Sequence, residues 1–112
     1  MKKLTFSSSI FIFNFLLIPS VIGGVPKDNA DHLLFGGGFS LGTTLCELTV
    51  FKDISLNRAL EYRDGYMSEW NKNSPEAIRD YQLVGTGLNL GITMLVEKND
   101  YKYSSCKEIM LK

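Results

Sequence analysis

The sequence predicts a mainly α fold, a small bundle of three to four helices closed by one disulfide. Apolar residues recur at helical spacing in three segments, and two of these segments follow a serine that suits a helix N-cap. The chain has only two cysteines, Cys46 and Cys106, which can form one intramolecular bond. A length of 112 residues is typical of one domain.

Residues 1–23 have the layout of a secretory signal peptide. Lys2 and Lys3 give a positive start, residues 10–18 form an apolar run, and Val21 and Gly23 suit a signal peptidase. We therefore expect cleavage after Gly23.

The alternative is an uncleaved membrane anchor. Residues 4–25 are nearly long enough to span a bilayer, but Asn14 and Pro19 interrupt them. The pattern favours the signal peptide.

Residues 24–32 are predicted to be a mobile leader. The stretch 25–31 is polar and contains Pro26, and His32 lies at its edge. A single helical domain is expected to fill residues 33–112.

The first helix of that domain is expected near residues 39–51. The run 33–46 carries no charge, but glycine is a poor helix former and three glycines occupy positions 36–38. Apolar residues at helical spacing begin after them, at Leu41, Leu45 and Leu48.

The second helix is expected over residues 56–71. Ser55 fits its N-cap, and Leu56, Leu60 and Met67 share one apolar face. Gly65 is a local weakness that costs up to about 1 kcal/mol.

The third helix is expected over residues 75–96. Ser74 suits the N-cap, Pro75 the first helical position and Glu76 the positive end of the helix dipole. For residues 101–112 the pattern fits a short strand and a further helical segment equally well.

Glycines four residues apart occur in both uncharged runs, as Gly38 and Gly42 and as Gly87 and Gly91. On a helix this spacing lets another backbone approach closely. We expect the first and third helices to cross there inside a soluble core. The other interpretation is a surface groove for a partner helix or a lipid.

The cysteines indicate an oxidising compartment. A bond between Cys46 and Cys106 would close a loop of about 60 residues and contribute roughly 4 kcal/mol in the chain-entropy model. Together with the signal peptide, the expected disulfide predicts an exported protein of the periplasm, the thylakoid lumen or the extracellular space. Two buried free thiols are the alternative.

Charge gives no support for nucleic-acid binding. The chain has 12 Lys plus Arg and 12 Asp plus Glu; without Lys2 and Lys3 this leaves 10 against 12, a net charge of about −2. The two signs are interspersed along the chain.

No motif predicts catalysis, a metal or a cofactor. Residues 85–91 are glycine-rich but lie within a predicted helix, without the strand that a phosphate-binding loop follows. His32 is the only histidine, and it stands beside the leader with no partner. Carboxylates near the turn after the second helix are explained by a solvated charged face. The protein is therefore expected not to be an enzyme.

Aromatic residues gather around the turn at residues 71–74. Tyr62, Arg63 and Trp70 are the candidate partner-binding residues, because aromatic and arginine side chains dominate protein interfaces. Core packing is the simpler explanation for Trp70 and for Tyr66, and Tyr62 is the one that falls off the apolar stripe.

The segment Leu41-Gly42-Thr43-Thr44-Leu45-Cys46 resembles part of the small helical immunity proteins of the Rap1a/Tai type, and the general layout resembles uncharacterised cyanobacterial exported proteins. The immunity proteins usually carry further cysteines and a Gly-Tyr-Ile segment; Gly65-Tyr66-Met67 is the nearest piece here. No functional residue is carried over.

Size, predicted export and the absence of catalytic motifs favour a non-enzymatic protein-binding module of the cell envelope: an inhibitor, an immunity-like factor or an accessory subunit. Its partner is expected to be another protein. The alternative is a membrane-anchored accessory subunit that keeps its N-terminal segment. A small hydrolase that uses His32 is the third hypothesis and has the least support.

Overall fold

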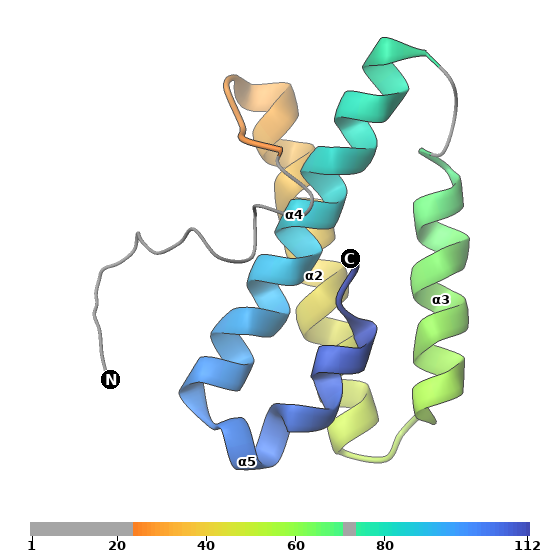
Figure 1. The fold of residues 1–112 in the computed structure, drawn as a ribbon, viewed down its shortest axis with the longest axis vertical. Coiled ribbons are helices and arrows are strands. Elements are labelled where there is room, and N and C mark those ends of the chain that lie inside the picture. The colour runs from red at the N-terminus through yellow and green to blue at the C-terminus, as the bar shows by residue number, and fades with distance from the viewer. Residues whose placement is uncertain (1–23, 71–73) are drawn as a thin grey trace.

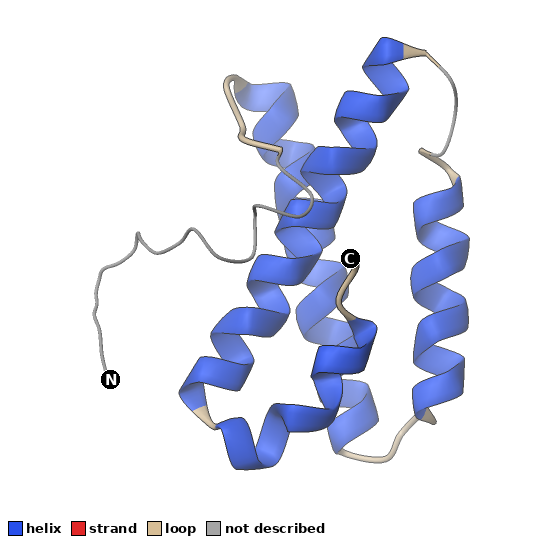
Figure 2. Ribbon diagram, in the orientation of Figure 1, coloured by secondary structure: helices blue, strands red, loops and turns tan. Residues whose placement is uncertain are grey.

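The structure is a computed structural model that describes residues 24–70 and 74–112. These residues form a small helical bundle without strands (Figure 2). Its elements are α2 (Asn29–Val50), α3 (Leu56–Ser68), α4 (Pro75–Lys98), α5 (Asp100–Tyr103) and the 3₁₀ segment η2 (Ser104–Ile109). The expected mainly α fold is confirmed, and the expected signal peptide lies outside the described residues.

Helices α2 and α4 form the centre of the bundle and cross with their backbones in contact (Figure 1). A Cβ placed on Gly91 would lie 2.7 Å from the carbonyl oxygen of Phe39, and one on Gly42 would collide with the carbonyl oxygen of Leu88. Gly38 and Gly87 are as closely opposed by backbone atoms of the other helix. The predicted close crossing is confirmed.

The start of α2 differs from the expected one. The helix begins at Asn29 and runs through the three glycines, with the Asp28 side chain accepting from the N–H of Asp31 as its N-cap. The low helix propensity of glycine is a local effect, and packing overrides it here because Gly38 meets α4.

Residues 24–32 do not behave as the expected mobile leader. Gly24 is buried, and its N–H donates to the Thr86 hydroxyl of α4. Asp31 is buried within the first turn of α2 and pairs with Arg79 of α4. The segment is therefore attached to the bundle at both ends.

The starts of the next two helices are as predicted. The Ser55 hydroxyl accepts from the N–H of Arg58 at the start of α3, and the Ser74 hydroxyl accepts from the N–H of Ala77 at the start of α4. Helix α3 lies at the edge of the bundle (Figure 1) and buries only Ala59 and Met67 completely.

The C-terminal segment is helical, which decides the question that the sequence left open. Its η2 turns place Cys106 against α2, where it forms the predicted disulfide with Cys46, with a Cα–Cα distance of 5.2 Å. Both cysteines are buried in the main core. That core also contains Leu45, Ala59, Leu88, Ile92, Tyr103 and Ile109.

Candidate functional site

Helix α3 presents its outer face to solvent. At 100° per residue, the side of α3 and its C-cap that lies opposite the buried Ala59 and Met67 is exposed, while the exposed Asp64 and Tyr66 lie on its flanks. We call this surface the outer face of α3. It consists of Arg58, Glu61, Tyr62, Gly65, Ser68 and Glu69.

Tyr62 is the aromatic residue of the outer face. Its side chain is 49% exposed, as predicted, and the Arg58 guanidinium lies 4.9 Å from the centre of its ring. Arg58 also forms an exposed ion pair of 2.9 Å with Glu61. The Arg58 guanidinium thus covers the Tyr62 ring, which limits the conformational freedom that binding would remove.

Gly65 lies at the centre of the outer face. A Cβ there would meet no other atom within 4 Å, so neither a tight contact nor a turn in the described part of the fold requires glycine. In an exposed helix interior glycine costs about 1 kcal/mol relative to alanine. The sequence marked this residue as a weakness, and the structure shows that the fold does not compensate for it.

Arg63 faces the bundle. Its Nη1 donates to the carbonyl oxygen of Ile109 at 3.0 Å, and its Nε donates to the Asp64 carboxylate at 2.8 Å. The side chain is 16% exposed. Arg63 therefore joins α3 to the C-terminal segment, a contact between residues far apart in the sequence.

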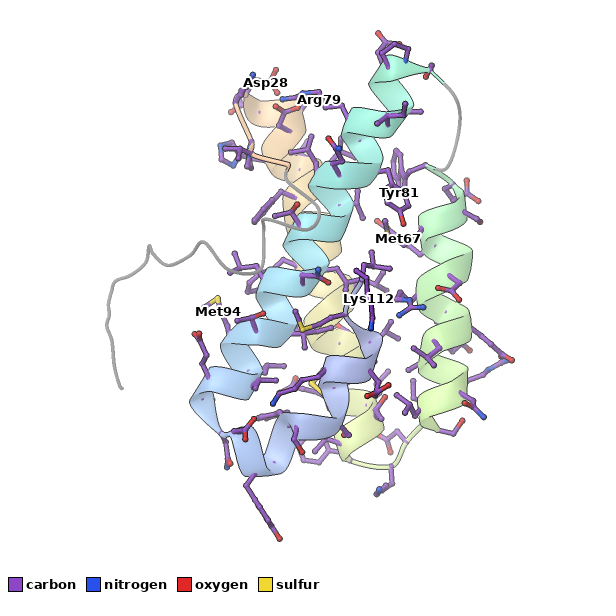
Figure 3. All side chains as sticks on the ribbon, viewed as in Figure 1. Asp28, Met67, Arg79, Tyr81, Met94 and Lys112 are labelled. Atoms are coloured by element: carbon purple, nitrogen blue, oxygen red, sulfur yellow. A yellow bond between two sulfur atoms is a disulfide. The ribbon has the colours of Figure 1, made fainter. Side chains whose placement is uncertain are left out.

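Trp70 is half-buried at the end of α3. Its indole N–H is enclosed and has no hydrogen-bond partner among the described residues. Nearby, Tyr81 of α4 and Met67 of α3 point toward one another between the two helices (Figure 3). The three predicted partner-binding residues are therefore not gathered on one face, and Tyr62 alone lies on the outer face of α3.

The remaining polar candidates show no catalytic arrangement. His32 is exposed on α2, and Glu61 and Asp64 are exposed members of surface ion pairs. Within residues 24–70 and 74–112, no three His, Cys, Asp or Glu side chains are grouped as metal ligands.

A shallow hollow of about 380 Å³ lies between residues 24–27 and the first half of α4. Lys27 and Arg79 border it, but both oxygens of the Asp31 carboxylate accept hydrogen bonds from Arg79. The Arg79 guanidinium at the hollow is therefore already paired with a carboxylate of this chain.

Among the described residues, α2 alone is long and apolar enough to cross a membrane. A core helix can meet the same test. In this structure the glycine face of α2 is covered by α4.

Comparison with known proteins identifies no relative: no family model, no curated protein and no solved structure matches the chain. The resemblance to the Rap1a/Tai immunity proteins stays a prediction.

Proposed function

We propose that the protein is a small exported, non-enzymatic module that binds another protein through the outer face of α3. The observation that carries the proposal is Gly65, an exposed glycine in the last turn of α3 that no contact among the described residues requires. A helix position without a side chain lets a second backbone approach closely, as Gly38 and Gly42 do inside this bundle.

The surroundings of Gly65 suit a partner helix. Residues four apart form ridges that fit the grooves of another helix, and Arg58 and Tyr62 form such a ridge beside the glycine. Tyr62 supplies an exposed, partly oriented ring of the kind that dominates binding energy at interfaces.

Charge on the outer face favours a basic partner. Glu61 and Glu69 stand about one turn before and after Gly65. Because the Arg58–Glu61 pair is well exposed, it binds weakly and is readily exchanged for a pair with the partner. We therefore expect a partner helix that carries a small residue at the crossing and lysine or arginine on either side of it.

A second copy of this chain fits less well. Two α3 helices that crossed antiparallel at Gly65 would set Glu61 against Glu69 of the other copy, and parallel helices would set each glutamate against itself. Like charges in direct contact disfavour such a pair. The proposed partner is therefore a different protein.

Photo-crosslinking in the native source tests the proposal. The full-length protein would carry a photoreactive amino acid in place of Tyr62 or, as a control, of Met94, which is exposed on the opposite side of the bundle (Figure 3). We expect one specific protein to crosslink from position 62 and not from 94, with the crosslink mapped by mass spectrometry to a basic helix. Crosslinks from position 94 alone would contradict the proposal, as would dimers of this chain.

Two glycine variants then separate binding from stability. Gly65→Ala and Gly36→Ala each add a methyl group at an open position of a helix, so both should stabilise the free protein. Only Gly65→Ala should weaken the affinity for the purified partner, by about tenfold or more. Equal affinity of the two variants would show that Gly65 is not at the interface.

The membrane-anchored accessory subunit is the second candidate: it keeps residues 4–25 as an uncleaved anchor, and the apolar run at residues 10–18 is the observation that favours it. Alkaline carbonate extraction of membranes distinguishes the two: a retained anchor keeps the protein in the pellet with Met1 intact, whereas the exported module is released without residues 1–23. Export itself is supported by the disulfide, which is typical of oxidising compartments.

A further inference from the structure

The first described residue is anchored on the side of α4. The N–H of Gly24 donates to the Thr86 hydroxyl at 3.0 Å, across 62 residues of sequence. Both residues are buried, and Thr86 is only 4% exposed. A buried hydroxyl so far inside a helix needs a partner, and Gly24 provides one.

Only glycine fits at this point. A Cβ on Gly24 would lie 2.7 Å from the carbonyl carbon of Gln82 and 2.7 Å from the nitrogen of Leu83. These are backbone atoms of α4, which cannot move aside as a flexible side chain would. The chain before α2 is therefore seated directly on the backbone of α4.

The other end of this short segment is also fixed. The N–H of Lys27 donates to the Asp31 carboxylate at 2.9 Å, and Arg79 of α4 donates to the same carboxylate at 2.6 Å. Residues 24–28 thus form a strap across α4. Gly24 fixes one end, and at the other the N–H of Lys27 is bonded to the carboxylate of the Asp31–Arg79 ion pair.

We propose that this anchor is the binding site for the mature amino terminus, and that Gly24 is its first residue. A signal peptidase adds water across the Gly23–Gly24 bond, which leaves a carboxylate on Gly23 and an amino group on Gly24. The same nitrogen, now a protonated amino group, still carries a hydrogen that it can donate to the Thr86 hydroxyl. A cut one residue later would remove the anchor, and the small residues at Val21 and Gly23 independently favour this bond.

The strap is then a structural part of the exported protein. The anchor residues lie on α4 and before α2, away from the outer face of α3. A start at Val25 or later, or variants that leave the strap unchanged, would therefore overturn this inference without touching the proposed binding face, whereas retention of Met1 would also favour the membrane-anchored candidate.

Mass spectrometry of the full-length gene product, expressed in a host that exports it, gives the first test. We expect a chain that begins at Gly24 and contains one disulfide. A start at Val25 or later, or retention of Met1, would overturn the inference.

Variants of the same exported protein give the second test. Thr86→Val removes the acceptor and Gly24→Ala pushes the chain off α4, so each should lower the unfolding temperature, Thr86→Val by about 4–8 °C. Because both substitutions disrupt the same contact between Gly24 and Thr86, the unfolding temperature of the double variant should fall no further than that of the less stable single variant. Thr86→Ser keeps the acceptor and should behave as the natural protein.

Hydrogen exchange supplies a readout that general destabilisation would not give. In Thr86→Val the amide of Lys27, which is bonded to the Asp31 carboxylate, should exchange faster than in the natural protein, while the amides of α3 keep their rates. Additive losses in the double variant, or unchanged exchange in the strap, would show that Gly24 and Thr86 do not act together.

Discussion

The carbonyl oxygen of Val84 occupies the place that a Cβ on Gly38 would take. The same relation joins Gly87 to Phe35 from the opposite direction, so each helix supplies glycines where the other supplies carbonyl groups. The spacing of the glycines therefore sets the distance between α2 and α4.

This relation predicts opposite effects for two neighbouring glycines. Gly38→Ala should destabilise the protein by about 2 kcal/mol or more, because its methyl group forces the two backbones apart. Gly36→Ala, two residues earlier on an open side of α2, should stabilise it by about 0.5–1 kcal/mol. Urea unfolding of both variants gives the comparison. Similar effects would mean that α2 and α4 do not cross at Gly38.

The disulfide is expected to be the largest single source of stability. The bond joins residues 60 apart, and a loop of this length contributes roughly 4 kcal/mol in the chain-entropy model. Addition of a reductant should therefore lower the unfolding temperature strongly. A Cys46→Ala/Cys106→Ala variant, already weakened, should show no further response. An unchanged transition in the natural protein under reductant would contradict this assignment.

The sequence predicted the features that depend on local patterns. Ser55 and Ser74 mark helix starts by their own chemistry, and the glycine spacing indicated the crossing because periodicity is visible in one segment at a time. The helix through Gly36 was missed because propensity was weighed without the packing that outweighs it.

The features that were missed depend on contacts between distant residues. Nothing near Gly24 indicates that Thr86 will accept its N–H, and nothing near Arg63 indicates the carbonyl group of Ile109. At the candidate site, the helical pattern predicted the exposure of Tyr62. Gly65 could be recognised as a candidate binding residue only from the structure, because no contact among the described residues explains a glycine there.

The pairing of Asp31 with Arg79 predicts a dependence of stability on pH. The Arg79 guanidinium, followed by backbone N–H groups, holds the pKa of the Asp31 carboxyl well below its usual range. A carboxyl whose pKa is lower in the folded state stabilises the fold above its unfolded pKa of about 3.9, and this contribution is lost as the pH falls toward the folded value.

Asp31→Asn should therefore lower the unfolding temperature at pH 7, and the difference from the natural protein should shrink below about pH 4. Thermal melts between pH 2 and pH 7 measure this. Asp64→Asn is the control, because that carboxyl is exposed and should show a small effect at every pH. A constant difference between Asp31→Asn and the natural protein would show that the pairing does not carry the stability.

Asn89 predicts how the C-terminus is held. Its amide nitrogen donates to the carbonyl oxygen of Leu111 at 2.8 Å, and its amide oxygen accepts from the N–H of Leu111 at 2.7 Å. The Asn89 side chain is only 1% exposed, so water has little access to replace either bond. The Asn89 side chain therefore pairs with both backbone polar groups of Leu111 and holds the end of the chain on α4.

Asn89→Asp keeps the shape and the acceptor but loses the donor, so the carboxylate faces the carbonyl oxygen of Leu111. We expect a loss of about 1–3 kcal/mol, because a buried polar group is left without a partner. Hydrogen exchange should show faster exchange at Leu111 while the amide of Cys106, held by the disulfide, changes less. Asn89→Leu removes both bonds but leaves no buried charge, so its tail should loosen at a smaller cost in stability. If Asn89→Asp and Asn89→Leu lower the free energy of unfolding equally, Asn89 contributes through packing alone, and Ile109 and the disulfide hold the end of the chain.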